Sequence, residues 1–186
     1  YHSCLIDIKT EEPLMNTSIV LTILADDQPG IIQAVSRVLH KYGGSWTQSS
    51  MSSLAGQFAG ILLVSLPREH SIACQQDLES LESQGLHVIT HISDKANEPE
   101  KTADYVLDLV GNDRQGIVHD ITTILAKHNV NVRVLETVVE AASMGGAELF
   151  RARAELLVSA STDIDLLANE LENLANDLMV DITFGK

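Results

Sequence analysis

Short apolar runs are followed by amphipathic segments at two places in the chain. Apolar and often β-branched residues fill Ile19–Ala25 and Tyr105–Val110, and runs of this length and composition predict strands. After each run, apolar residues recur every three or four positions, which predicts a helix with one buried face. The two stripes are Ile31, Val35, Val38, Leu39 and Tyr42, and Ile117, Ile121, Ile124, Leu125 and His128. Gly43 and Asn129 tolerate the left-handed conformation that commonly ends a helix.

The same order of elements continues after each predicted helix. Two more strands are predicted in each half, at residues 45–53 and 57–66 and at residues 131–141 and 148–159. Gly56 and Gly145-Gly146 mark the reversals between them. A second helical stripe follows, formed by Cys74, Leu78 and Leu81 before Gly85, and by Ile164, Leu167, Leu171, Leu174 and Leu178 after the capping residues Ser161, Thr162 and Asp163. Final strands are predicted at residues 86–92 and 178–184.

The two halves are copies of one unit. Residues 18–50 align without a gap on residues 104–136 at an offset of 86, and 7 of the 33 positions are identical. Farther along, Leu62–Ser65 matches Leu156–Ser159 at an offset of 94, which predicts eight additional residues near Ala141–Ala147 in the second copy. Apolar strands alone do not explain the alignment, because it includes the polar and glycine identities Asp27/Asp113, Gly30/Gly116 and Lys41/Lys127.

The order βαββαβ, present twice, predicts an α+β protein of two ferredoxin-like domains, each an antiparallel sheet with helices on one face. We expect an N-terminal arm at residues 1–16, a first domain at 17–93, a polar linker at 94–102 and a second domain at 103–186. Both sides of the first strand are largely apolar, with Ile19, Leu21 and Ile23 on one side and Val20 and Leu24 on the other. An open sheet face normally carries alternating polar residues. We therefore expect the bare face or the sheet edges to be covered by the other copy or by another chain, unless a central strand is buried on both sides.

The charge of the chain narrows the classes of partner. Twelve basic and 26 acidic residues give a net charge of −14, and each half carries −7. DNA phosphates and anionic membrane surfaces repel such a chain, so direct nucleic-acid binding and membrane binding are not expected. No apolar run approaches the roughly 20 residues of a membrane span. Cys4 and Cys74 do not have metal-ligand spacing, so we expect reduced thiols in a cytoplasmic protein with no metal and no cofactor.

The candidate site is the turn between the first strand and the first helix of each copy. The start of a helix presents backbone N–H groups without partners and a partial positive charge, which suit a carboxylate or a phosphate. A glycine at that point lets a ligand approach the backbone. Asp27 and Asp113 are placed either to cap the helix or to bind an ammonium group. The candidate ligand-binding residues are Asp27, Gln28, Gly30 and Ile31 in the first copy and Asn112, Asp113, Gly116 and Ile117 in the second.

These turns resemble a known family. Asp27-Gln28-Pro29-Gly30-Ile31 and Asp113-Arg114-Gln115-Gly116-Ile117-Val118 are similar to the Asp-Arg-Pro-Gly-Ile/Val signature of ACT domains. Gly43–Trp46 and Leu54–Ile61 further resemble the tandem ACT proteins of the glycine cleavage system transcriptional repressor family. The resemblance implies a regulatory module that binds small amino acids at domain interfaces and represses through a partner activator protein. Gln28 replaces the usual Arg and Gln115 the usual Pro, which leaves the equality of the two sites open.

The first functional hypothesis is a non-enzymatic regulator that senses a small amino acid, with glycine or serine as the first ligands to test. Its partners would be a transcription activator or another regulated protein, and the sequence leaves a homodimer open. A second hypothesis is a ligand-free protein-interaction module. A third is an acylphosphatase-like enzyme, since those enzymes share the topology and use an arginine in the corresponding loop, where Arg114 stands, with Asn112 and Asn131 nearby in sequence.

Other polar and aromatic residues have simpler interpretations. His87 and His91 share one face of a strand but are roughly 13 Å apart at a rise of about 3.3 Å per residue, too far for one metal ion. Arg151 and Arg153 are expected to pair across strands with Glu136 or Glu140, with anion binding as the alternative. Trp46 and Phe58 are expected to fill the core.

Overall fold

The computed structural model describes residues 15–93, 102–141 and 148–186. The chain divides into two compact units, Tyr1–Asn97 and Glu98–Lys186, and we call them domain 1 and domain 2. Each unit is described separately below. Gly145 and Gly146, predicted at the second reversal, lie outside the described residues.

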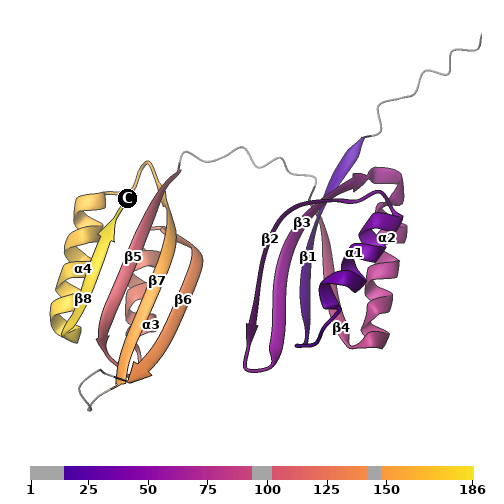
Figure 1. Ribbon diagram of the computed structural model, residues 1–186. Helices are drawn as coiled ribbons and strands as arrows, with labels where there is room; N and C mark the ends of the chain where they lie inside the picture. The colour runs from indigo at the N-terminus through magenta and orange to yellow at the C-terminus, as the bar shows by residue number, and fades with distance from the viewer. Residues whose placement is uncertain (1–14, 94–101, 142–147) are drawn as a thin grey trace, which may run out of the picture. The chain divides into compact units, whose positions relative to one another are not determined.

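Domain 1 contains a four-stranded antiparallel sheet with its helices on one face (Figure 1). The elements are β1 (Asn16–Asp26), α1 (Ile31–Lys41), β2 (Ser45–Leu54), β3 (Gln57–Pro67), α2 (Ser71–Glu79) and β4 (Leu86–Ser93), with single 3₁₀ turns at Arg68–His70 and Ser80–Gln84. The strand order is β2-β3-β1-β4. This is the βαββαβ order that the sequence predicts.

Domain 2 repeats this architecture with the strand order β6-β7-β5-β8. Its elements are β5 (Thr102–Asn112), α3 (Ile117–Lys127), β6 (Asn131–Ala141), β7 (Glu148–Ser159), α4 (Ile164–Leu178) and β8 (Val180–Gly185). One predicted boundary is wrong, because Leu178 ends α4 and does not begin the last strand. Met179, left-handed at φ 54°, separates the two elements.

Each domain has its own core between the sheet and the helices. Every second residue of β1 is buried, including Ile19, Leu21 and Ile23, because alternate side chains of a strand point to the same face. The helical stripes supply the other side of the core through Ile31, Val35 and Leu39 in α1 and Ile117, Ile121 and Leu125 in α3. Phe58 packs against the core as predicted. Trp46 does not, since 36% of it is exposed on the edge strand β2.

Strand pairing corrects the predicted alignment of the two copies. Ile19 pairs with Val64, and Tyr105, which is the equivalent of Ile19 at an offset of 86, pairs with Leu156. Leu156 lies 92 positions after Val64, so the second hairpin is longer by six residues, not by eight. The sequence match at an offset of 94 is a slip of two positions, which leaves every side chain on the same face and is therefore invisible in the apolar pattern.

One glycine of domain 2 is needed for packing between two strands. Gly111 of β5 pairs with Val180 of β8. A Cβ atom on Gly111 would lie 2.2 Å from Val180 Cγ1 and 2.7 Å from Val180 Cβ, distances that no real contact tolerates. In domain 1 the equivalent pair is Ala25 and Leu86, and both residues are buried.

Candidate ligand-binding turns

The turn between the first strand and the first helix has the same backbone in both domains. Gly30 precedes α1 with φ 101° and ψ −6°, and Gly116 precedes α3 with φ 99° and ψ −9°. This left-handed conformation favours glycine over any residue that carries a side chain. The backbone conformation of the turn therefore favours glycine at both positions, whether or not these residues also contact a ligand.

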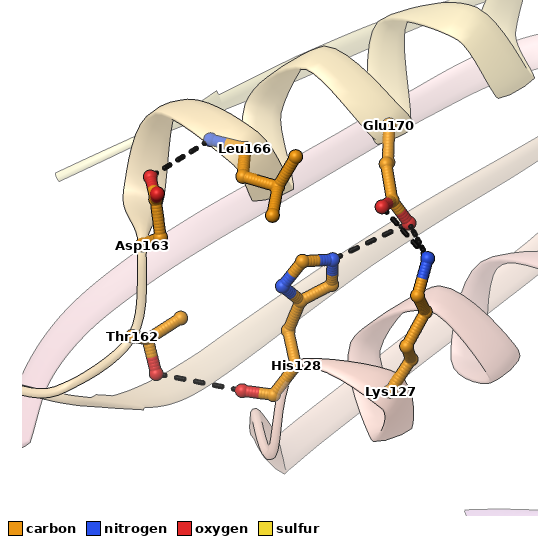
Figure 2. Close-up of polar contacts among 6 residues, drawn as sticks. All are labelled: Lys127, His128, Thr162, Asp163, Leu166 and Glu170. Atoms are coloured by element: carbon orange, nitrogen blue, oxygen red, sulfur yellow. Dashed lines mark hydrogen bonds and ion pairs between the residues drawn. The ribbon is translucent and has the colours of Figure 1, made fainter.

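The start of α1 and of α3 carries no side-chain cap. The first intrahelical bonds run from Ala34 N to Gly30 O and from Asp120 N to Gly116 O, both 2.9 Å. The amides of residues 31–33 and 117–119 have no hydrogen-bond partner among the described residues. The suggested capping role of Asp27 and Asp113 is therefore wrong. In contrast, α4 is capped as predicted, because Asp163 Oδ1 accepts a 3.0 Å hydrogen bond from Leu166 N (Figure 2).

Asp27 instead ties the turn of domain 1 to the neighbouring hairpin. Ser53 Oγ donates to Asp27 Oδ2 at 2.6 Å, and Asp27 N donates to Gly56 O at 2.8 Å. Gln57 Nε2 donates to Asp26 Oδ1 at 2.6 Å on the same side. One carboxylate oxygen of Asp27 is thus fixed by a hydroxyl group, and the other has no partner among the described residues.

The turn of domain 2 keeps the backbone contact and lacks the side-chain contact. Asp113 N donates to Glu148 O at 2.8 Å, in the same way as Asp27 N. The position equivalent to Ser53 is Val139, and within the described ranges the Asp113 carboxylate has no hydrogen bond or ion pair. Asn112 ends β5 beside it and is exposed. The turn of domain 2 therefore has the same backbone contact and the same aspartate, but no described side chain holds its carboxylate in place.

Both turns are open to the outside. A Cβ atom on Gly30 would meet nothing within 4 Å, and one on Gly116 would have Asp120 Oδ2 at 3.9 Å as its nearest neighbour. Gln28 is exposed, whereas Ile31 and Ile117 are buried with 4% and 2% exposure. These two isoleucines anchor their helices in the core, so only their backbone groups remain available to a ligand. The binding role of all eight predicted residues stays a prediction.

Each domain also contains a polar contact between its two helices, which we call the helix clamp. In domain 1, Lys41 Nζ and Tyr42 OH both donate to Asp77 Oδ2 of α2, at 2.6 Å and 2.8 Å. The hydrogen bond from Lys41, followed by that from Tyr42, holds the pKa of Asp77 below its ordinary value. The contact with Asp77 raises the pKa of Lys41.

The helix clamp of domain 2 replaces the tyrosine with a histidine. Lys127 Nζ donates to both oxygens of Glu170 at 2.8 Å and 2.9 Å, and His128 Nε2 lies 3.3 Å from Glu170 Oε2 (Figure 2). The hydrogen bond from Lys127 is the main reason why the pKa of Glu170 is lowered. Sequence reasoning missed both clamps, although the identity of Lys41 and Lys127 in the repeat was the available signal.

The remaining candidate residues belong to the surface and the core. His87 and His91 are exposed on β4, with His87 Nδ1 3.3 Å from Glu82 Oε1, and no cluster of metal-ligating side chains occurs among the described residues. Arg151 pairs with Glu140 as expected, but Arg153 pairs with Asp108 of β5 at 3.0 Å. Arg114 is exposed, and none of the described residues bonds to it. Cys74 is fully buried, and burial raises the pKa of its thiol to about 11.

Comparisons with known proteins agree with this architecture. Residues 17–92 match the ACT domain family. A crystal structure of an unknown protein from Galdieria sulphuraria superposes with a TM-score of 0.82 and 29% identity, covering 92% of this chain and 98% of the other. The structure of a protein assigned as a glycine cleavage system transcriptional repressor superposes with a TM-score of 0.65 and 17% identity, covering 92% and 97%. A search of curated proteins found no match.

Residues 17–92 thus match the ACT domain family, and the second unit repeats the fold of the first, so the chain has a tandem ACT-like fold. Within the described ranges, none of the helices combines the length and the hydrophobicity that crossing a membrane requires.

Proposed function

We propose that this chain is a non-enzymatic, cytoplasmic regulator that binds a small amino acid, with glycine or serine as the first candidates, at its two turns. The observation that carries the proposal is the pair of open, uncapped helix starts behind Gly30 and Gly116. The ligand carboxylate would bind the free amides of the first helical turn, where the helix dipole favours negative charge. Asp27 in domain 1, and Asn112 with Asp113 in domain 2, would bind the ammonium group.

Regulation would be exerted on transcription through a partner protein and not through direct contact with DNA. The net charge of −14 supports this, because a chain with 26 acidic and 12 basic residues gains little from phosphate contacts. The structural likeness to a protein assigned as a transcriptional repressor supports the same role. The amino acid must bind one arrangement of the domains or chains better than another, since only a difference in affinity shifts such an equilibrium.

Isothermal titration calorimetry of the full chain with glycine, serine and the other common amino acids tests the proposal. We expect binding by at least one of them, and affinity reduced about tenfold or more at the substituted site in Asp27→Asn and in Asp113→Asn, because each loses a charged partner for the ammonium group. Asp181→Asn, which removes an exposed carboxylate of β8, is the matched control and should bind as the wild type does.

Absence of heat with every amino acid would contradict the sensing role and favour the ligand-free interaction module. Hydrolysis of an acyl phosphate, if lost in Arg114→Ala, would favour the acylphosphatase-like enzyme instead. The three hypotheses therefore separate with one ligand screen and one hydrolysis assay.

A further inference from the structure

Domain 2 contains a narrow cleft of about 20 Å³ between α3 and the edge strand β6. Among the described residues that line it, Thr122 is the polar one, and its hydroxyl group already donates to Val118 O at 2.7 Å. The apolar lining includes Val118 and Ile121 of α3, Leu135 of β6, and Ala152 and Ala154 of β7. Such a space offers water no free hydrogen-bond partner, so it suits a small apolar group.

The cleft arises from a small residue in the core of domain 2. Ala154 pairs with Leu107, and the equivalent pair in domain 1 is Leu62 with Leu21. Ala154 and Leu62 are both buried, with 3% and 1% exposure. A buried alanine in place of a leucine leaves space unless its neighbours move in to fill it.

In domain 1 the corresponding region is covered by a long side chain of the edge strand. Met51 of β2 packs against the core, and a Cβ atom on Gly60 would lie only 2.8 Å from Met51 Cγ. Thr137 and Ala152 form the equivalent pair in domain 2. A threonine side chain is too short to cover the core as Met51 does. The cleft is therefore open in domain 2 and covered in domain 1.

The cleft and the candidate turn of domain 2 share a residue. The side chain of Val118 lines the cleft and is 40% exposed, and its amide is one of the three at residues 117–119 that have no partner among the described residues. Val139, 47% exposed, takes the place of Ser53, the residue whose hydroxyl group binds Asp27 in domain 1. A carboxylate held by these amides would therefore lie beside an apolar surface in domain 2 and beside a hydroxyl group in domain 1.

We propose that the turn of domain 2 binds an aliphatic amino acid, with valine as the first candidate, and that a methyl group of its side chain enters the cleft. This inference rests on the proposed function and narrows the ligand of domain 2, while glycine and serine are the candidates for domain 1. The chain then senses two classes of amino acid, each through its own domain.

The size and polarity of the cleft select this class of ligand. Its 20 Å³ is slightly more than the roughly 10–15 Å³ that one water molecule needs, so it admits about one methyl group. Glycine leaves the cleft empty, and an aromatic ring is too large for it. Serine would bring a hydroxyl group into a space without a free hydrogen-bond partner, which costs free energy.

Two variants test the cleft by giving domain 2 the residues of domain 1. Ala154→Leu fills the cleft with the side chain found at Leu62. Leu135→Ser removes an apolar side chain that is 44% exposed, and Ser49 is its equivalent in domain 1. Far-UV circular dichroism checks that each variant is folded, and Leu135→Ser decides the question if Ala154→Leu does not fold.

The matched control is Val138→Ser, on the same strand as Leu135. Val138 is 51% exposed and pairs with Arg151, so it lies on the opposite face of the sheet from the cleft. Isothermal titration calorimetry of the full chain with valine, glycine, serine and phenylalanine gives the affinities. Asp27→Asn and Asp113→Asn assign each binding event to its domain.

We expect valine to bind and its affinity to fall in Asp113→Asn but not in Asp27→Asn. Ala154→Leu and Leu135→Ser should each raise the dissociation constant of valine by about tenfold or more, because one methyl group in an apolar pocket is worth about 10–200-fold. Both variants should leave glycine binding in domain 1 unchanged, and Val138→Ser should bind valine as the wild type does.

Four outcomes would overturn this proposal and leave the proposed function standing. They are binding of glycine or serine without binding of valine, loss of valine binding in Asp27→Asn alone, valine affinity unchanged in the folded cleft variants, and phenylalanine bound as tightly as valine. An equal loss of valine affinity in Val138→Ser would also overturn it, because that residue does not line the cleft. Absence of heat with every amino acid would overturn the proposed function and this inference together.

Discussion

Domain 1 and domain 2 share a backbone but differ at the surface. The buried stripe of the first helix keeps its type, with Ile31, Val35 and Leu39 in one copy and Ile117, Ile121 and Leu125 in the other. On the sheet face that points away from the helices, Thr22 and Ile61 of domain 1 correspond to Asp108 and Arg153 of domain 2. The core is thus maintained by the fold, whereas the exposed face is free to diverge. The divergence leaves exposed apolar side chains on this face of domain 1 and an exposed ion pair on the equivalent face of domain 2.

The two turns between the first strand and the first helix also share a backbone conformation and differ in their side-chain contacts. Gly30 and Gly116 have the same conformation because the path from strand to helix requires it. Ser53 fixes Asp27, whereas Val139 leaves the carboxylate of Asp113 without a partner among the described residues. The backbone of the turn is therefore a requirement of the fold, and the side chains around it set how rigid each candidate site is.

The largest effect is expected from a cavity in the core of one domain, which tests whether the two domains unfold independently. Leu21 and Leu107 occupy equivalent buried positions, with exposures of 0% and 1%. Leu21→Ala should lower the free energy of unfolding of domain 1 by about 2–5 kcal/mol, and Leu107→Ala should do the same to domain 2, because each leaves a cavity in its own core.

Urea unfolding can separate these two effects. Trp46 is the single tryptophan of the chain and reports on domain 1 by its fluorescence, while far-UV circular dichroism reports on both domains. Leu21→Ala should shift the fluorescence transition, and Leu107→Ala should leave it in place. An equal shift in both variants would show that the domains unfold as one cooperative unit.

A smaller loss of stability is expected from removing the side-chain cap of a helix. Asp163→Ala removes the only side-chain cap found on the four α-helices of the described residues and should destabilise domain 2 by about 1 kcal/mol. Asp113→Ala removes no cap and should change the stability of domain 2 much less. The midpoints of urea unfolding followed by circular dichroism give the comparison, and equal losses would refute the assigned cap.

The smallest effect concerns acid stability and the two helix clamps. The pKa values of Asp77 and Glu170 are lowered in the folded chain by Lys41 and Lys127. A carboxyl whose folded pKa is lowered contributes stability above its unfolded pKa, and that contribution is lost as the pH falls through the folded pKa. In Asp77→Asn, the free energy of unfolding of domain 1 should therefore decrease less steeply as the pH falls. Glu170→Gln should have the same effect on domain 2.

Urea midpoints measured from about pH 7 to about pH 3 would show this, and added salt should reduce the difference because both pairs are partly exposed to solvent. Each variant should affect its own domain alone. A profile that remains as steep as that of the wild type would mean that other carboxylates dominate the acid response.

Most of the fold could be predicted from the sequence because periodicity and repetition agree. The apolar stripes locate the four α-helices found in the described part of the chain, and Gly43 and Asn129 follow α1 and α3 with positive φ as expected. The offset of the second hairpin could not be predicted, because a slip of two residues preserves the alternation of a strand. The exposure of Trp46 was also missed, since its place on an edge strand depends on the strand order.

The candidate site was predicted less completely than the fold. The turns and their glycines follow from the repeated residues, but the role of Asp27 depends on Ser53, which lies 26 positions later in the sequence. The helix clamps depend in the same way on residues of the second helix of each domain. Contacts of this kind come from tertiary structure and leave no local pattern in the chain.

The close packing of Gly111 and Val180 has a consequence for how the protein assembles. A chain that carries the same unit twice risks exchanging a strand between its copies during folding, a common error of repeated domains. At the place of Gly111, β1 carries Ala25, whose methyl group would occupy the space that Val180 fills. Strand β8 is therefore sterically matched to β5 and mismatched to β1. One missing methyl group thus favours the pairing of β8 with its own domain.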